Sequence, residues 1–295
     1  MERPRLTPRR FGAASEDFNH IDVRPYSTVI GAEIGGVDLS TPLEPATLAE
    51  IRRAFLDWKV LFFRGQHLTV VQHADLARHW GELYVNPHLP DAGIEQVARI
   101  VHDESDPGNE NMWHSDATHW DKPPLGSLLR AVKVPEFGGD TLWADLGAAY
   151  DGLPQALKER LVGLTAIHTQ PAPDALSAAL LRRKGTRVRH SVAEHPLVRE
   201  HPETGRPILF VNPVFTSHVV GLPSQDSSAL LDLLFRQVSF PEYQVRFRWE
   251  VGSIAFWDNR STVHYGVNDY FPSCRIMERA TILGDRPFPP AAVGS

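Results

Sequence analysis

The segment Trp113-His114-Ser115-Asp116 places an imidazole and a carboxylate two positions apart. In an extended chain, residues two apart point to the same side, so His114 and Asp116 can face one point. A third ligand can come from His264, far downstream. Two imidazoles and one carboxylate on one face leave three metal positions open, the arrangement that non-haem Fe(II) oxygenases use to bind a cosubstrate and O2. The residue types therefore favour an iron site that carries out oxidation.

Two other interpretations compete with this one. Zinc hydrolases also use two histidines and one carboxylate, but their ligands usually lie in an HExxH helix or a related pattern, which the sequence lacks. An isolated His-x-Asp pair also arises by chance. The iron interpretation therefore depends on residues further along the chain.

Two arginines downstream supply that support. If residues 275–282 form a strand, Arg275 and Arg279 lie on one face of it. Buried guanidinium groups are costly unless anions pair with them. Two neighbouring arginines therefore predict two anionic partners, or one anion and a protein carboxylate, and a bidentate arginine suits the distal carboxylate of 2-oxoglutarate. The alternative is an edge strand whose arginines are solvated.

The elements that must position these residues are mainly short strands. The strands are expected over residues 23–36 as short runs, 60–63, 127–132, 141–144, 164–168, 207–211, 243–249, 253–257 and 276–283. Helices are expected around the apolar stripe Leu48, Ile51, Phe55 and Trp58, and over 71–80, 153–161 and 227–238. Many short strands broken by Gly and Pro, with helices to one side, favour a jelly-roll barrel over alternating βαβ units.

Composition narrows the possible partners and the location. The chain has 295 residues, enough for one large domain, which we expect over 23–290. The Pro- and Arg-containing N-terminus predicts a flexible lead-in over residues 1–22. A net charge of -6 and the lack of a long apolar run argue against nucleic-acid and membrane partners. Cys274 is the only cysteine, and the N-terminus lacks the apolar core of a signal peptide, so we expect a cytoplasmic protein. The basic stretch from Asp174 to His190 is open to two interpretations, a mobile lid or a solvated loop.

The sequence resembles the taurine dioxygenase family of Fe(II)- and 2-oxoglutarate-dependent dioxygenases, which includes sulfonate, alkyl-sulfate and phenoxyalkanoate dioxygenases. The matching segments are WHSDATHWDKPP, EFGGDTLWADLGAAYDGL, HPLVREHPETGRPILFVN and WDNRSTVHYGVNDYFPSCRIMERATILGD, with weaker matches at GAEIGGVDLSTPL and VLFFRGQ. The resemblance implies a mainly β fold with peripheral helices (α+β), a cupin-like double-stranded β-helix or jelly roll. It also implies Fe(II) as cofactor, with 2-oxoglutarate and O2 as cosubstrates.

The resemblance further assigns roles to single positions. The iron ligands it implies are His114, Asp116 and His264. Thr141 and Arg275 match the positions that bind the 2-oxoglutarate carboxylate, and Arg279 matches the arginine that grips the sulfonate in taurine dioxygenase. The implied reaction hydroxylates the substrate and decarboxylates 2-oxoglutarate to succinate and CO2. When the hydroxylated carbon carries sulfonate, sulfate or an ether oxygen, the product collapses to an aldehyde or ketone.

Three departures from the family pattern bear on the substrate. Asn86 stands where taurine dioxygenase has a histidine that helps to hold the sulfonate, Glu110 where it has an asparagine, and His119 where it has a phenylalanine. Asn86 can donate a hydrogen bond but cannot become a cation. Glu110 would repel an anion if it faced the pocket, or attract an amine. We therefore expect an anionic substrate other than taurine, unless these positions face solvent.

The sequence thus predicts an enzyme that hydroxylates a small anionic organic molecule, such as a sulfonate, sulfate ester or carboxylate. We also expect a homo-oligomer, a dimer or a tetramer. Two alternatives stay open. One is oxidation of an amino-acid-like substrate by desaturation or isonitrile formation, which Glu110 and His119 allow. The other is a jelly-roll binding protein without catalysis, which the presence of all three ligands and Arg275 disfavours.

Overall fold

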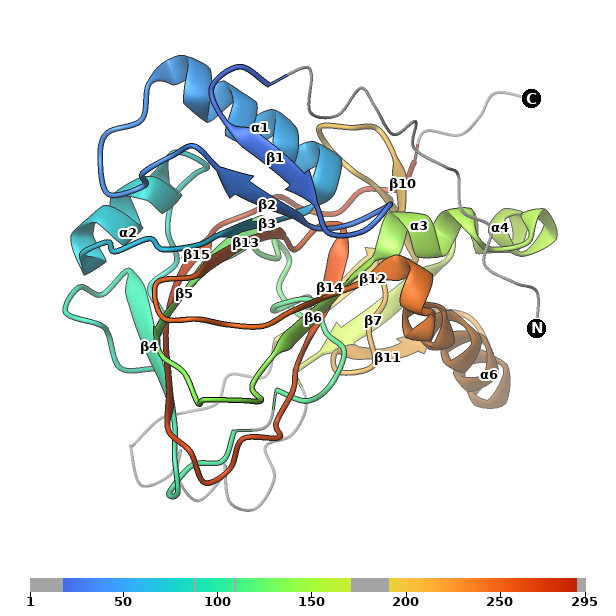
Figure 1. Cartoon of the computed structure of the whole chain (residues 1–295). Coiled ribbons are helices and arrows are strands. Elements are labelled where there is room, and N and C mark those ends of the chain that lie inside the picture. The colour runs from blue at the N-terminus through green and yellow to red at the C-terminus, as the bar shows by residue number, and fades with distance from the viewer. Residues whose placement is uncertain (1–17, 88, 109, 171–190, 291–295) are drawn as a thin grey trace.

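The computed structural model describes residues 18–87, 89–108, 110–170 and 191–290. One wall of a barrel is a seven-stranded sheet. Its strands are β1 (Asp22–Pro25), β2 (Ala32–Gly35), β3 (Val60–Phe63), β4 (Val97–His102), β5 (Gly126–Lys133), β13 (Ile254–Asp258) and β15 (Arg275–Ile282). They lie side by side in the order β1-β2-β3-β13-β5-β15-β4 (Figure 1). Neighbouring strands are antiparallel except β2 and β3, which are parallel.

Smaller sheets form the facing wall. Their strands are β6 (Thr141–Asp145), β7 (Thr165–Thr169), β8 (Val192–Pro196), β9 (Val198–Glu200), β10 (Pro207–Leu209), β11 (Thr216–Val219), β12 (Gln244–Phe247) and β14 (Thr262–Gly266). They pair in the orders β12-β6-β14, β11-β7-β8 and β10-β9. Phe62 of β3 meets Trp143 of β6 with 5.5 Å between ring centroids, so apolar side chains of both walls share one core. Two antiparallel walls around a common core form the predicted jelly roll.

Helices cover the barrel on two sides. They are α1 (Pro45–Trp58), α2 (Val70–Arg78), α3 (Leu146–Asp151), α4 (Gln155–Leu161) and α6 (Ser224–Phe235). Helices α1 and α2 cover the large sheet, where Phe55 stacks on Phe256 at 4.0 Å between ring centroids, while α3, α4 and α6 gather beside the smaller sheets (Figure 1). The prediction that helices lie to one side was therefore wrong, because the later helices are crossovers on the opposite flank. Among the described residues, no helix has both the length and the apolar character needed to cross a bilayer.

Most predicted elements are present within a few residues. The strand predicted over 60–63 coincides with β3, and the helices predicted over 71–80, 153–161 and 227–238 correspond to α2, α4 and α6. Strands β4, β8, β9, β11 and β14 and helix α3 were not predicted. Helix α3 has only six residues, too few to show a helical repeat, and begins where Asp145 caps two backbone N–H groups. The lid or loop predicted over 174–190 lies outside the described residues.

The predicted lead-in over residues 1–22 falls partly within the described range. The backbone N–H groups of Asn19 and His20 each donate to the Glu50 carboxylate at 2.8 Å, and Ile21 is buried in the core. The packed structure therefore begins upstream of the predicted domain boundary.

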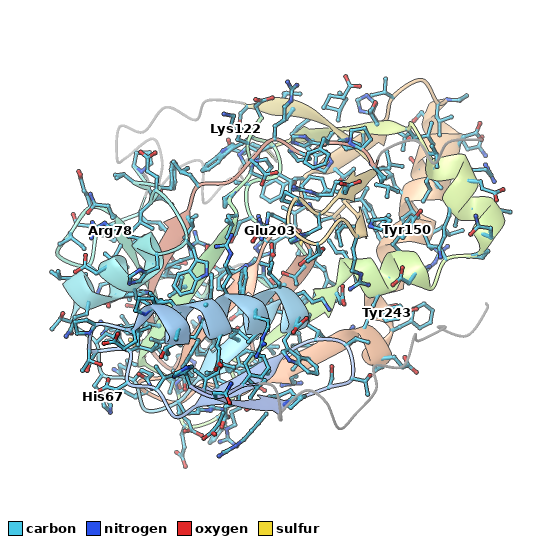
Figure 2. All side chains as sticks on the ribbon, turned by 90° about the horizontal axis from the view of Figure 1, so that it is seen from above. His67, Arg78, Lys122, Tyr150, Glu203 and Tyr243 are labelled. Carbon is cyan, nitrogen blue, oxygen red and sulfur yellow. The ribbon has the colours of Figure 1, made fainter. Side chains whose placement is uncertain are left out.

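A buried charge network holds the turn between β13 and β14. Asp258 accepts hydrogen bonds from Arg260 Nε and Nη2 at 2.9 and 2.8 Å and from His201 Nε2 at 2.9 Å. Glu203, just above α1 in the view of Figure 2, pairs with Arg260 at 2.9 Å and with Arg52 of α1 at 2.5 Å. Burial opposes ionisation of Asp258, but the Arg260 guanidinium keeps the pKa of this carboxyl far below its ordinary value. Paired charges therefore fix the turn from its outer side.

Candidate active site

The two predicted histidine ligands lie on adjacent extended segments. His264 is the central residue of β14, and the segment around His114 pairs with it in antiparallel. The His114 N–H donates to His264 O at 3.0 Å, and the His264 N–H donates to His114 O at 2.7 Å. The two rings are 4.1 Å apart between centroids. Backbone pairing therefore joins residues that are distant in the sequence.

Asp116 lies on the same side as His114, as the alternation of an extended chain predicts. The intervening Ser115 points the other way, and its Oγ donates to Thr262 O at 2.8 Å. The Asn259 side chain clamps the backbone of Asp116, because its Oδ1 accepts from the Asp116 N–H at 2.6 Å and its Nδ2 donates to Asp116 O at 3.0 Å. The carboxylate is thus positioned from the turn that the charge network holds.

The three side chains converge with atoms suited to a metal. Asp116 Oδ1 lies 4.0 Å from His114 Nε2 and 3.9 Å from His264 Nε2, and one ligand atom of each residue lies within 4.8 Å of the others. His114 Nδ1 lies 2.8 Å from Met112 O, which places the proton on Nδ1 and leaves the Nε2 lone pair for a metal. Asp116 Oδ2 is buried and has no hydrogen-bond partner within the described ranges. This donor set fits Fe(II).

The protonation states also suit a metal. Burial, reinforced by His114, lowers the pKa of His264 to about 3, so its imidazole is neutral near pH 7. Burial opposes ionisation of Asp116, but the Arg279 guanidinium holds the pKa of this carboxyl below its ordinary value. Neutral imidazole and ionised carboxylate are the forms that bind metal ions.

The three ligands line a cavity of about 750 Å³. The predicted cosubstrate and substrate residues that also line it are Thr141, Arg275, Arg279 and Glu110. Apolar side chains of β4, β5 and β15 form part of the same wall, among them Ile100, Leu129 and Met277. A cavity of this size with a few convergent polar groups is typical of small-molecule sites.

Arg275 and Arg279 share one face of β15, as predicted. Strand β15 is bordered by β4 and β5, so the alternative of an edge strand with solvated arginines was wrong. Among the described residues no carboxylate forms an ion pair with Arg275, and its Nε is buried without a hydrogen-bond partner. Burial lowers the pKa of Arg275. Tyr270, Glu110 and Asp140 act against this shift, but none of the described carboxylates lies within ion-pair distance of Arg275. A buried guanidinium in this state fits an anionic ligand.

Arg279 differs from Arg275 because it already has a protein anion. Its Nη1 donates to Asp116 Oδ1 at 3.3 Å. The sequence predicted either two anionic ligands for the arginine pair, or one anionic ligand and one protein carboxylate. The structure matches the second arrangement, since Asp116 pairs with Arg279 and none of the described carboxylates forms an ion pair with Arg275. The Arg279 Nε is buried and lacks a partner in the described part of the chain, so this side chain retains hydrogen-bonding capacity.

Glu110 faces the cavity beside His102, a residue that the sequence did not point to. His102 Nε2 lies 3.1 Å from Glu110 Oε1, and His102 Nδ1 lies 3.8 Å from Asp106 Oδ1. Glu110 outweighs burial and raises the pKa of His102. The strand register sets His102 opposite Arg275, a relation that no local pattern reveals. The negative charge of Glu110 is therefore balanced inside the cavity.

Asn86 and His119 are not among the described residues that line the cavity. Asn86 is half-buried, and Leu89, three positions later, reaches the wall instead. The buried ring of His119 lies 4.8 Å from the ring of Phe215, which does line the cavity. Burial lowers the pKa of His119 to about 4, which keeps it neutral. Direct substrate contact by these two residues stays a prediction, and the geometry places His119 behind Phe215.

The chain is similar in sequence and structure to known dioxygenases and to an alkylsulfatase. The model of the taurine catabolism dioxygenase TauD, TfdA family matches residues 22–281. An alkylsulfatase of Acinetobacter baylyi is 38% identical over 274 residues, which cover 90% of this chain and 86% of the relative. An alpha-ketoglutarate-dependent sulfate ester dioxygenase of Pseudomonas putida is 39% identical over 276 residues, or 90% of this chain and 91% of the relative. The crystal structure of a taurine dioxygenase from Burkholderia xenovorans has a TM-score of 0.81 at 40% identity, covering 92% of this chain and 94% of its own.

Proposed function

Because the chain belongs to the TauD, TfdA family of 2-oxoglutarate-dependent non-haem iron dioxygenases, we propose that it hydroxylates an alkyl sulfate ester. In this reaction class one oxygen atom of O2 enters the substrate and the other enters succinate, as 2-oxoglutarate loses CO2. Hydroxylation of the carbon that bears the sulfate breaks a C–H bond and forms a C–OH group. The C–O bond to sulfate then breaks, which yields an aldehyde and hydrogen sulfate.

The proposal gives a role to the metal-binding residues, to Thr141 and Arg275, and to the apolar wall of the cavity. The residues that would hold Fe(II) are His114, Asp116 and His264. Bound Fe(II) supplies the activation of O2 and the oxidising power. Thr141 and Arg275 would bind the distal carboxylate of 2-oxoglutarate, and the Asn259 clamp keeps Asp116 aimed at the metal position. The apolar wall excludes water from the reacting carbon.

The observation that carries the substrate class is the placement of Arg279 and an apolar wall in one cavity. Arg279 offers a guanidinium to an anionic head group, while Ile100, Leu129 and Met277 offer apolar surface to an alkyl chain. A sulfate ester with an alkyl chain uses both features, whereas taurine has no apolar chain. The names of the two relatives, alkylsulfatase and sulfate ester dioxygenase, support the same substrate class.

An amino-acid-like substrate is the second candidate, because Glu110 faces the cavity. Its ammonium group would have to compete with His102, whose Nε2 is 3.1 Å from Glu110 Oε1. Breaking a partly buried ion pair to form another yields little net affinity. This geometry favours the anionic substrate.

A substrate comparison with the Fe(II)-loaded enzyme tests the proposal. Succinate, aldehyde and sulfate are measured with hexyl sulfate, taurine, 2,4-dichlorophenoxyacetate and an N-alkyl amino acid as substrates. We expect the highest kcat/KM with hexyl sulfate, together with one aldehyde and one sulfate per succinate. Preference for taurine or for the amino acid contradicts the proposed substrate class, and absence of succinate with every compound contradicts the activity.

We further propose that the protein acts in the cytoplasm as a homo-oligomer, a dimer or a tetramer. The single cysteine, Cys274, supports a reducing compartment because no disulfide within the chain is possible. Light scattering of the purified protein tests the assembly state, and cell fractionation tests the location.

A further inference from the structure

Trp249 lies beside Thr141 and Arg275, the two cavity residues proposed to bind the distal carboxylate. It follows β12, two residues beyond Phe247, which pairs with Thr141 of β6. The segment is held on both sides, because Arg64 Nη1 donates to Arg248 O at 2.8 Å and the Glu250 N–H donates to Ser253 Oγ at 3.2 Å. The indole is 4% exposed and is not among the described residues that line the cavity. Its position is therefore set by the fold.

The indole makes one directed contact, to the hydroxyl of Thr141. Trp249 Nε1 donates to Thr141 Oγ1 at 2.9 Å. Because an indole nitrogen only donates, this bond uses a lone pair of the hydroxyl oxygen and leaves the hydroxyl hydrogen free to be donated. Within the described ranges, no protein acceptor takes that hydrogen from Thr141, although the residue is only 4% exposed. A buried hydroxyl that has accepted but not donated fits a ligand acceptor in the cavity.

The same indole also lies beside Arg275. The guanidinium carbon of Arg275 is 5.8 Å from the Trp249 ring centroid, within the range of a cation–π interaction. A Cβ added at Gly139 would meet Arg275 Cδ at 3.4 Å, so little space separates the arginine stem from the backbone of Gly139. Trp249 therefore borders both groups that face the carboxylate position.

We infer that Trp249 is a positioning residue for the distal carboxylate of 2-oxoglutarate. It acts through Thr141, whose hydroxyl it turns into a donor aimed at the carboxylate, and it restricts the Arg275 guanidinium from the side. This role rests on the proposed function of Thr141 and Arg275. Trp249 should therefore increase the affinity only for a 2-oxo acid that ends in a carboxylate. An acid that ends in a methyl group offers no acceptor to the Thr141 hydroxyl.

Binding without turnover separates this role from a structural one. Calorimetry on the full chain loaded with Mn(II) measures the Kd of 2-oxoglutarate and of 2-oxopentanoate, which has a methyl group in place of the distal carboxylate. Trp249→Phe keeps a ring but removes the N–H. We expect it to weaken 2-oxoglutarate about tenfold, as for loss of one charge-assisted hydrogen bond, and to leave 2-oxopentanoate unchanged.

A double-mutant cycle shows whether Trp249 acts through Thr141. In the Thr141→Val background, Trp249→Phe should have no further effect on 2-oxoglutarate, whereas in the Thr141→Ser background its effect should persist. Trp143→Phe controls for loss of an indole N–H that makes no hydrogen bond, because the Nε1 of Trp143 has no partner among the described residues. Trp143 lines the cavity, and its ring centroid is 6.4 Å from that of Trp249. Trp143→Phe should preserve the preference for 2-oxoglutarate over 2-oxopentanoate.

Four results would overturn the inference. Equal weakening of both acids by Trp249→Phe, or an undiminished effect in the Thr141→Val background, would show a merely structural role. If the wild type binds 2-oxoglutarate and Trp249→Phe binds it with the same Kd, the role of Trp249 is refuted, while the proposed function is unaffected. Failure of the wild type to bind 2-oxoglutarate would refute the proposed function and this inference with it. If Trp249→Phe has a lowered Tm, the difference between the Tm shifts induced by the two acids gives the same comparison.

Discussion

Replacing Arg275 with methionine should stabilise the unliganded protein and nearly abolish its affinity for 2-oxoglutarate. In the structure, Arg275 is partly buried, its Nε lacks a hydrogen-bond partner, and among the described residues no carboxylate pairs with it. Replacing a poorly compensated cation with an apolar side chain of similar length removes a desolvation cost. We expect a gain of about 1 kcal/mol in the free energy of unfolding, a low value because the side chain is only partly buried.

When the cosubstrate is present, Arg275→Met should instead be less stable to unfolding than the wild type. Loss of one partner of a desolvated charge pair costs about 2–5 kcal/mol of binding energy, which is roughly 30- to 5,000-fold in Kd. At a ligand concentration of 100 times its Kd, 2-oxoglutarate should stabilise the metal-loaded wild type by about 2.7 kcal/mol. It should stabilise Arg275→Met by no more than about 0.9 kcal/mol at that concentration.

Urea denaturation with Mn(II), with and without 2-oxoglutarate, measures both effects. Arg260→Met is the matched control, since Arg260 is buried and paired with Asp258. It should lose about 3–5 kcal/mol of stability, because it leaves a buried carboxylate without its partner. If Arg275→Met is destabilised as strongly as this control and still binds 2-oxoglutarate, Arg275 is a structural residue and the assigned role is wrong.

Three further outcomes are expected. His264→Ala should lose one Fe(II) per chain and the visible charge-transfer band that forms with 2-oxoglutarate under anaerobic conditions; full band intensity would exclude His264 as a ligand. Arg279→Leu should raise the KM for hexyl sulfate at least tenfold and keep that band, so an equal rise in the KM for 2-oxoglutarate would contradict its assignment to the substrate. Burial lowers the pKa of His73 to about 4, below the unfolded value of about 6.5. Only the unfolded state therefore gains a proton as the pH first falls below 6.5, and about 3 kcal/mol of stability should be lost between pH 6.5 and 4. Urea melts of His73→Gln at pH 7.5 and 5 should show a smaller loss than the wild type.

The parts of the site that the sequence predicted depend on short-range geometry. His114 and Asp116 share a side because an extended chain alternates, and Ser115 indeed points away to Thr262. Arg275 and Arg279 share a face for the same reason. These relations follow from residues two or four positions apart, so no knowledge of the fold was required.

The parts that were missed depend on register between distant strands. His102 lies opposite Arg275 because β4 pairs with β15. Glu110 reaches it from a segment held to β14, where the Gly266 N–H donates to Glu110 O. Trp249 meets Thr141 because β12 pairs with β6 so that Phe247, the last residue of β12, lies opposite Thr141. Trp249 follows two residues later and donates to the Thr141 hydroxyl. The strand predicted over 243–249 included Trp249, but the prediction did not say with which strand it would pair. A single sequence does not specify such pairings.

Before ligands bind, the two arginines of β15 differ in whether a protein carboxylate pairs with them. Arg279 shares the charge of Asp116 at 3.3 Å, whereas Arg275 has no carboxylate partner in the described part of the chain. When Asp116 ligates a metal ion, the negative charge available to Arg279 is reduced, and the need of that guanidinium for an external anion rises. The need of Arg275 does not depend on Asp116 in this way. In the proposed function, Arg279 would therefore couple binding of the anionic head of the substrate to metal loading, while Arg275 and Thr141 would bind the distal carboxylate of 2-oxoglutarate independently of Asp116.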